Sequence, residues 1–450
     1  MQDYVLELLN TKKFTELKTV LSDMNPYDLV EYLELIPKNE LPLVFRILPK
    51  ELAAETFVEM DPDMQVLLIE AFSDKELRDM LSELFVDDTV DIIEEMPATV
   101  AKRIIRQSDA QTRREINQIL AYPDNSAGSI MTTEYVDLKA NMTVREAFTR
   151  IRQTGLDKET IYTCYVTDSR RKLVGIVTAK DLMLSESEKT IGEIMDENII
   201  FAFTTNDKED IVRLFDKYDM LALPIVDTEN RLIGIVTVDD AIDVLQEETT
   251  EDIEKMAAIM PSDKTYLRTG VFETFKARIP WLLILMLTAT FTGWIISAFE
   301  SALAAQSALI AFIPMIMNTG GNSGSQSSVS VIRSLSLGDI DFRDSFIVFF
   351  KEFRVSIICG VVLATANFAK IILLDNMLLG SGISYEIAFV VSLTLLATVI
   401  FAKIVGCLLP IGAKKIRLDP TVMASPFITT LVDTVSLLIY FTIASILLSL

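Results

Sequence analysis

The sequence from Pro314 to Gln326 reads Pro-Met-Ile-Met-Asn-Thr-Gly-Gly-Asn-Ser-Gly-Ser-Gln, and it lies inside an apolar run that begins near Ser307. On a helix, Asn318, Asn322 and Gln326 would share one face because each stands four residues after the last. Hydrocarbon offers amide side chains no hydrogen-bond partner. We therefore expect this polar face to lie against protein or water at membrane depth.

Small residues recur within the same segment. Gly320, Gly324 and Ser328 occupy every fourth position, a spacing that lets a second helix approach closely. Helix packing alone is one interpretation of this pattern. Because amide side chains line the same segment, we favour a helix that borders a water-filled path.

The last apolar segment, residues 422–448, carries a second polar stripe. Five of its side chains fall within about 80° of arc on a helix: Ser425, Thr429, Asp433, Ser436 and Tyr440. Asp433 is the only acid of the segment, and a carboxylate at membrane depth is costly. One interpretation pairs it with a base such as Lys403 or Arg333. We favour an ion path, since ionisable residues inside membranes are usually functional.

These two segments resemble the MgtE family of magnesium channels. The shared residues are Pro314, Thr319-Gly320-Gly321-Asn322-x-Gly324-x-Gln326, Asp419-Pro420, Pro426 and Asp433, and the resemblance covers nearly the whole chain. It implies a homodimeric channel in which a largely hydrated Mg²⁺ lies between two Asp433 carboxylates, with Asn322 and Ser425 contacting its water shell. It also implies a pore helix that contains Pro314, Gly320, Gly321, Gly324 and Gln326.

Hydropathy divides the chain, which has 450 residues and a formal net charge of −23. The first 275 residues are rich in charge, and the remainder reads as membrane. Five candidate spans are long enough to cross a bilayer: roughly 280–299, 307–335, 345–374, 385–410 and 422–448. Lys and Arg flank alternate connections only, so we expect a multi-pass cell-membrane protein with a cytoplasmic N-terminal half and an external C-terminus. We see no cleavable signal peptide.

The sequence lacks the motifs of several common types of metal site and enzyme active site. Cys164, Cys359 and Cys407 are scattered without CxxC spacing, which indicates neither a disulfide framework nor a thiolate metal site. The G-x-x-x-x-G-K-[ST] loop and the H-E-x-x-H motif are absent. We therefore expect a transport protein that is not an enzyme, with the lipid bilayer and divalent metal ions as partners and no nucleic acid.

Residues 1–122 read as short helices. Turn signals recur about every dozen residues, and apolar residues between them follow helical spacing, as in Leu41, Val44, Phe45 and Leu48. This pattern predicts an all-α, superhelical N domain.

Residues 123–248 contain an internal repeat. Leu173–Leu182 is echoed by Leu232–Ala241, and Ile-Met precedes each copy. Buried strands, turns and a capped helix are predicted in each copy, and the pattern resembles a tandem CBS pair, an α/β sensor module. Such modules often bind adenine nucleotides, with an aspartate at the position of Asp181 contacting ribose. Asp181 is equally suited to the first turn of a helix, so ATP stays an open cofactor here.

Acidic residues are dense after the second repeat. Asp240, Asp243, Glu247, Glu251 and Glu254 share a helix face. A solvated acidic face is one interpretation, and hard oxygen ligands for Mg²⁺ are the other. The resemblance implies regulatory Mg²⁺ between the N domain, the CBS pair and a connecting helix. The acids that match this expectation are Glu55, Asp87, Asp91, Asp207, Glu209, Asp219, Asp240, Asp243, Glu248, Glu251, Asp252 and Asp419.

The fold class expected is thus multi-domain. A connecting helix at residues 249–279 joins the soluble half to a pore domain of five transmembrane helices at residues 280–450. We expect a Mg²⁺-selective channel or transporter that imports magnesium and closes when cytosolic Mg²⁺ binds the acids. The alternative is a regulated channel or transporter for another divalent cation, such as Co²⁺ or Mn²⁺.

Overall fold

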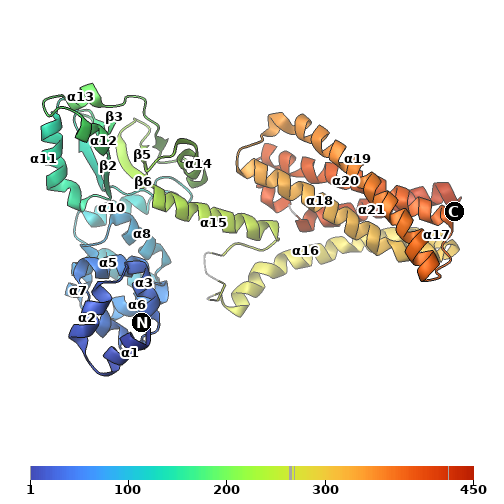
Figure 1. Cartoon of the computed structure of the whole chain (residues 1–450), viewed down its shortest axis with the longest axis horizontal. Coiled ribbons are helices and arrows are strands. Elements are labelled where there is room, and N and C mark those ends of the chain that lie inside the picture. The colour runs from blue at the N-terminus through green and yellow to red at the C-terminus, as the bar shows by residue number, and fades with distance from the viewer. Residues whose placement is uncertain (1, 263–265, 268, 424, 450) are drawn as a thin grey trace. The chain divides into compact units, whose positions relative to one another are not determined.

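The structure is a computed structural model that describes residues 2–262, 266–267, 269–423 and 425–449. It comprises two compact units, Met1–Leu245 and Gln246–Leu450 (Figure 1). The first unit holds a helical N domain and an α/β domain, and the second is helical. The predicted fold class is confirmed for these three parts.

Short helices separated by turns open the first unit. Asn25 caps α3 by accepting a hydrogen bond from the Tyr27 amide at 3.0 Å, and Pro26 occupies the first position of that helix. Apolar faces of these helices share one core, in which Leu17 and Phe57 are fully buried. The helices are α1 (Gln2–Asn10), α2 (Phe14–Ser22), α3 (Pro26–Glu34), α4 (Leu41–Phe45), α5 (Lys50–Val58), α6 (Pro62–Ala71), α7 (Asp74–Leu81), α8 (Val86–Glu95), α9 (Ala98–Gln107) and α10 (Thr112–Ile119).

Two similar lobes follow, as the internal repeat predicts. In each lobe a first strand pairs in parallel with the second, which pairs antiparallel with the third. The first lobe contains β1 (Tyr135–Leu138), α11 (Val144–Thr154), η1 (Gly155–Asp157), β2 (Thr160–Thr167), β3 (Leu173–Thr178) and α12 (Ala179–Leu184). The second contains α13 (Ile191–Ile194), β4 (Ala202–Phe203), α14 (Lys208–Tyr218), β5 (Ala222–Val226), β6 (Leu232–Thr237) and the start of α15 (Val238–Met256).

The glycine in each repeat has a packing reason. A Cβ atom on Gly175 would lie 2.5 Å from Met195 Sδ, and one on Gly234 would lie 2.8 Å from Met131 Sδ. Each repeat thus receives the methionine of the Ile-Met pair that precedes the other lobe. This exchange ties the two lobes together and explains why both motifs recur.

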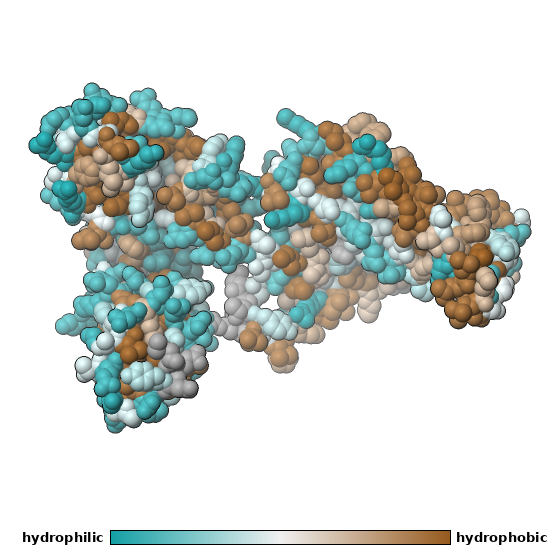
Figure 2. Space-filling model, viewed as in Figure 1, coloured by the Kyte–Doolittle hydropathy of each residue, from teal (hydrophilic) through white to brown (hydrophobic). Residues whose placement is uncertain are grey.

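Long helices form the second unit. After the end of α15 come α16 (Val271–Ala298), α17 (Glu300–Ala305), η2 (Ser307–Phe312), α18 (Ile313–Ser336), η3 (Phe342–Asp344), α19 (Ser345–Lys370), η4 (Ile371–Leu378), α20 (Tyr385–Lys415), η5 (Pro420–Met423) and α21 (Ser425–Leu448). Within this unit α18 packs against both α20 and α21 (Figure 1). Exposed side chains of α16 and α19 are largely hydrophobic, and brown patches cover much of this unit in Figure 2. Such a surface suits lipid.

Four helical segments among the described residues are long and apolar enough to cross a membrane: Val271–Ala298, Phe342–Leu378, Tyr385–Lys415 and Pro420–Leu448. They match four of the five predicted spans. The remaining predicted span contains α18, whose amides, serines and glycines lower its hydropathy. A fifth crossing by α18 therefore stays a prediction.

The connecting helix differs from the expected one. It starts earlier, at Val238, because it continues the last helix of the second lobe, and it ends at Met256. A new helix, α16, begins at Val271, and the described residues between the two helices, which include Pro261 and Gly270, are not helical. The prediction of one helix over residues 249–279 is therefore wrong, since two helices share that range.

Candidate functional site

The glycines and the amides of α18 lie on different faces. Gly320 and Gly324 are buried, and a Cβ on Gly324 would lie 2.8 Å from Ile428 Cγ2 of α21 and 3.2 Å from the Ala402 carbonyl oxygen of α20. Gly406 of α20 is equally close, since its Cβ would meet the Gly324 carbonyl oxygen at 2.3 Å. The small-residue spacing therefore serves helix packing inside the unit.

The amide face of α18 is exposed. Asn318, Asn322 and Gln326 are all exposed at the surface of this unit, and Asn322 Nδ2 donates a hydrogen bond to Asn318 Oδ1 at 3.3 Å. Pro314 stands at the start of the helix, where its missing N–H leaves no hydrogen bond unmade. A row of amides at the outside of an otherwise apolar helical unit needs water or protein opposite it.

Asp433 of α21 lies beside this helix. Its Oδ1 atom is 3.6 Å from the position of a Cβ on Gly321, the residue before Asn322. That oxygen is buried and makes no hydrogen bond to any described residue. One turn away, Ser325 Oγ and Thr429 Oγ1 are 3.4 Å apart. The geometry thus places a carboxylate next to the polar segment of α18. Ser425 opens α21, and its side chain lies outside the described part of the structure.

Lys403 does not neutralise Asp433. Its ammonium lies 4.0 Å from Glu352 of α19, and both of these side chains are largely buried. Ser327 Oγ of α18 lies 2.7 Å from Glu352 Oε2. Arg333 is exposed, and among the described residues no ion pair joins it to Asp433. Neither base considered in the paired interpretation therefore holds this acid.

Carboxylates gather in the first unit around the start of α8. Asp87 and Asp88 occupy its first turn, Asp240 occupies the first turn of α15, and Glu134 and Glu159 flank β1 and β2. We call these five residues the acidic cluster. Glu134 Oε2 accepts hydrogen bonds from the Val86 amide at 3.0 Å and from Thr132 Oγ1 at 3.1 Å, so the N domain and the first CBS lobe meet here.

Burial and mutual repulsion raise the pKa values of these carboxyls. Burial is the larger cause for each of them. It raises the pKa of Asp88 to about 7 and that of Glu159 to about 8, with neighbouring carboxylates adding to both shifts. The pKa of Asp240 rises to about 6 for the same reasons, and burial followed by repulsion from Asp240 raises the pKa of Asp87 well above its usual value. Asp87 Oδ1 is buried without a hydrogen-bond partner among the described residues.

The acidic cluster includes only part of the predicted metal set. Asp87 and Asp240 belong to it, and Asp243 is near enough to raise the pKa of Glu59. Asp88, Glu134 and Glu159 were not predicted, since no spacing along the chain links them. As the side chains stand, no group of three or more His, Cys, Asp or Glu residues in the described ranges is arranged to hold a metal ion. The cluster is therefore a concentration of buried carboxyl groups that suits a hard cation, and two of its oxygens, Asp87 Oδ1 and Glu159 Oε2, are buried without a hydrogen-bond partner among the described residues.

The other predicted acids lie elsewhere. Glu55 and Asp91 are exposed on α5 and α8, and Glu248 is half-buried on α15. Three residues have local roles around α14: Asp207 caps it by accepting from the Glu209 amide at 2.9 Å, Glu209 pairs with Arg213, and Asp219 ends it in the left-handed conformation. Glu251, Asp252 and Asp419 belong to the second unit, where Lys255 lies between Glu251 and Asp419.

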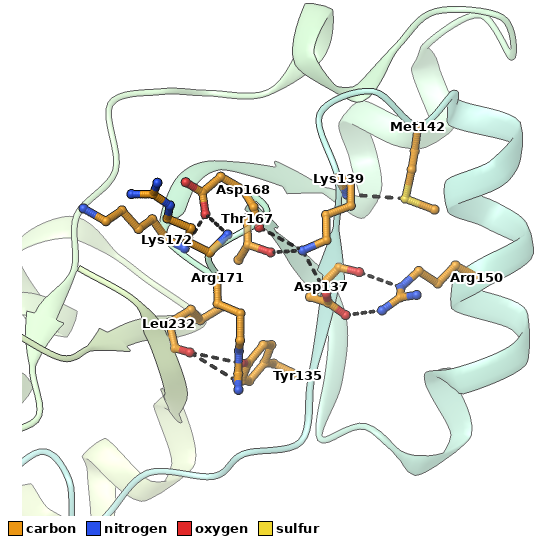
Figure 3. A network of polar contacts seen from close by, with 11 residues as sticks. Tyr135, Asp137, Lys139, Met142, Arg150, Thr167, Asp168, Arg171, Lys172 and Leu232 are labelled. Atoms are coloured by element: carbon orange, nitrogen blue, oxygen red, sulfur yellow. Dashed lines mark hydrogen bonds and ion pairs between the residues drawn. The ribbon is translucent and has the colours of Figure 1, made fainter. Parts of the chain in front are cut away.

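Asp181 is exposed at the start of α12. Its carboxylate accepts hydrogen bonds from the Thr178 amide at 3.1 Å and from Thr178 Oγ1 at 2.5 Å, which makes it a helix-capping residue in the structure. A separate cavity of about 260 Å³ lies in this domain beside β1, lined by Thr133, Tyr135, Asp137, Lys158, Thr167 and Arg171. Figure 3 shows the network at its wall, where Arg171 donates to the Tyr135 hydroxyl and to the Leu232 carbonyl.

These features together define a multi-domain membrane transport protein: a charged helical domain, a CBS pair with buried acids, and apolar helices that carry a polar face. Family models match the same three parts. "Divalent cation transporter" (MgtE) matches residues 313–443, "MgtE intracellular N domain" matches residues 24–125, and the CBS domain matches residues 127–188 and 191–247.

Relatives match along almost the full chain. Two proteins named magnesium transporter MgtE are similar to it: one from Thermus thermophilus, 36% identical over 96% of this chain and 95% of its own, and one from Bacillus subtilis, 32% identical over 98% and 96%. A crystal structure of the cytosolic domain of the Mg²⁺ channel MgtE in complex with ATP covers 54% of this chain and all of its own, with 33% identity and a TM-score of 0.52. The chain belongs to the MgtE family of divalent cation transporters, and the predicted resemblance is confirmed.

Proposed function

We propose that the protein is a Mg²⁺-selective channel or transporter that imports magnesium across the cell membrane. Its relatives carry the name magnesium transporter, which supports the choice of ion. The observation that carries the proposal is the carboxylate of Asp433, which has no partner among the described residues and lies beside the polar segment of α18 in an apolar helical unit. Ionisable groups in such a place usually serve an ion path.

A second copy of the chain completes the path in this proposal. The exposed amides of Asn318, Asn322 and Gln326 cannot face lipid without losing their hydrogen bonds, so a homodimer that brings two α18 helices together accounts for them. Mg²⁺ keeps several of its waters when it binds, because it dehydrates reluctantly. We place a hydrated ion between two Asp433 carboxylates, with Asn322 and Ser425 at its water shell.

Regulation by cytosolic Mg²⁺ is proposed at the acidic cluster. Carboxylates that are buried together repel one another, and a divalent cation relieves that repulsion. Mg²⁺ that binds Asp87, Asp88 and Asp240 would hold the N domain against the CBS pair, and mass action would then favour this compact state. We link that state to the closed path, with the N-terminal domains in the cytoplasm and the C-terminus outside.

Two refinements of the proposal need separate tests. All-oxygen coordination also admits Co²⁺ or Mn²⁺, so competition between Mg²⁺ and these ions in uptake distinguishes the alternative from the main proposal. A relative binds ATP in its cytosolic domain, and Asp181 is the residue that would contact ribose here. Calorimetric titration of the soluble half with ATP, before and after Asp181→Ala, tests whether this cofactor binds.

The deciding experiment is uptake by Asp433 variants. Asp433→Ala and Asp433→Asn should both abolish Mg²⁺ uptake, because neither retains the charge, while the protein stays folded and at normal abundance. Thr434→Ala on the same helix is the matched control, since the Thr434 hydroxyl donates to the Thr430 carbonyl of its own helix. Growth of a Mg²⁺-requiring strain on the Asp433→Ala variant at normal expression would disprove the path.

A further inference from the structure

A lysine lies between two acids of the second unit that the sequence assigns to metal. Lys255 Nζ lies 2.5 Å from Glu251 Oε1 and 2.8 Å from Asp419 Oδ2. Glu251 stands one turn earlier on α15, whereas Asp419 is 164 residues away along the chain. Only 27% of the lysine side chain is exposed, so water shields these ion pairs incompletely.

Asp419 uses both of its carboxylate oxygens. Oδ2 binds Lys255, while Oδ1 accepts hydrogen bonds from the Thr421 amide at 2.8 Å and from Thr421 Oγ1 at 2.5 Å. These bonds order η5, the turn that leads into α21. Burial acts to raise the pKa of Asp419, but the hydrogen bonds from Lys255 and Thr421 together outweigh it and hold that pKa below its usual value. Asp419 is thus a fixed anion at the entry to the helix that carries Asp433.

The end of α15 also contacts α18. Ser336 Oγ, in the last turn of α18, donates to Asp252 Oδ2 at 3.2 Å. Thr249, Ile253 and Met256 line a small cavity together with Ile332, Arg333 and Ser336 of α18. The last turns of α15 therefore have polar contacts to α18, through Asp252, and to Asp419 just before η5, through Lys255.

The two carboxylates of this junction are close enough for a single divalent ion. Both oxygens contact one nitrogen atom, so their separation cannot exceed the sum of the two contact distances. Mg²⁺ binds carboxylate oxygens at about 2.0–2.1 Å, and a small side-chain rotation would bring both oxygens to one ion or to its water shell. An ammonium and a metal ion cannot occupy that space together.

We propose that Lys255 is an internal counter-cation that competes with Mg²⁺ for Glu251 and Asp419, and that it thereby raises the Mg²⁺ concentration at which this junction binds metal. Lys255 is a positioning residue in this scheme: it holds α15 to η5 when the ion is absent, and Mg²⁺ takes over that contact by displacing the ammonium. The inference rests on the proposed regulation by cytosolic Mg²⁺, and it assigns to Lys255 the control of Mg²⁺ binding at Glu251 and Asp419.

Metal binding to the purified full-length protein tests this role independently of transport. Mn²⁺ serves as the probe, because the electron paramagnetic resonance signal of the free ion reports how much is bound. Lys255→Met should bind one more Mn²⁺ per chain than the wild type at concentrations where the wild-type junction is empty, with affinity there about tenfold higher. Lys255→Met/Asp419→Asn should lose that additional ion. Lys255→Arg keeps the charge and should match the wild type.

Lys351→Met is the control for loss of a lysine, since Lys351 is exposed on α19. Repeating the titration with Asp433→Asn in every variant removes the proposed path from the comparison, so a failure of that assignment leaves this test intact. Equal Mn²⁺ binding by the wild type and a folded Lys255→Met variant would overturn the inference. So would an additional ion that persists after Asp419→Asn.

Discussion

Asp88→Asn tests whether the acidic cluster stores repulsion that a metal ion relieves. Burial, and next Asp240, raise the pKa of Asp88 from 3.8 to about 7. Between about pH 4 and pH 7 the Asp88 carboxyl keeps a proton in the folded state that it has lost in the unfolded chain. The contribution of this group to the free energy of unfolding is therefore highest below about pH 4 and falls as the pH rises to about 7. One pKa unit corresponds to about 1.36 kcal/mol, which sets an upper limit of about 4 kcal/mol for this group at pH 8.

The substitution should therefore stabilise the metal-free protein at pH 8. Removing the Asp88 charge also lowers the pKa of Glu159, so the destabilisation is shared between the two groups, and we expect a gain of about 1–3 kcal/mol. For a unit of this size that is a rise in Tm of roughly 2–10 °C. The assay is thermal unfolding of residues 1–262, measured by circular dichroism at pH 5 and pH 8, since the cytosolic domain of a relative crystallised by itself.

Mg²⁺ should have the same effect as the substitution. Millimolar Mg²⁺ should raise the Tm of the wild type more at pH 8 than at pH 5, because protonated carboxyls do not bind it, and should raise that of Asp88→Asn less. Glu31→Gln is the control, since Glu31 is exposed on α3. A wild-type Tm that is constant from pH 5 to pH 8, or equal Mg²⁺ responses in wild type and Asp88→Asn, would refute the reasoning.

Two further predictions concern the helical unit. Gly324→Leu should lower the Tm of the detergent-purified protein and reduce uptake, because a Cβ already meets Ile428 at 2.8 Å and overpacking costs about 1–3 kcal/mol or more; uptake and melting like the wild type would contradict this packing. Lys403→Met should destabilise the same preparation by about 3–5 kcal/mol, since it leaves Glu352 buried and unpaired, whereas Lys403→Met/Glu352→Gln should recover most of that loss. A double variant no more stable than the single one would show that the pair does not act as a unit.

The fold of the soluble half could be predicted from patterns of residues that are close together in the sequence. The repeat around Gly175 and Gly234 predicted two equal lobes, and the methionine sulfur atoms that fill the space beside these glycines show why no larger side chain fits. Each of these signals depends on residues near one another in the chain or in a duplicated copy. Such patterns determine strands, caps and turns before any long-range contact is known.

The sequence predicts that Pro314–Gln326 is polar, but the directions of its faces needed the structure. Spacing alone left Gly320 and Gly324 as either a packing surface or part of a path. The structure assigns these glycines to contacts with α20 and α21, while Asn322 and Gln326 lie on the exposed face. The break after Met256 was missed, because Pro261 and Gly270 were read as part of a continuous helix.

Charges were hardest to place from sequence, because helical spacing gives a face and not its surroundings. Asp87 and Asp88 stand in the first turn of α8, where any acid is favoured by the free amides and by the helix dipole. The same two residues have raised pKa values because folding buries them. Repulsion from Asp240 of α15 and from Glu134 of the first CBS lobe adds to both shifts. The acids near the end of α15 have different surroundings. Lys255 forms ion pairs with Glu251 of the same helix and with Asp419, which is distant in the sequence. A run of acids therefore does not by itself indicate a metal site, because folding decides which of its members are buried together and which are paired with a lysine.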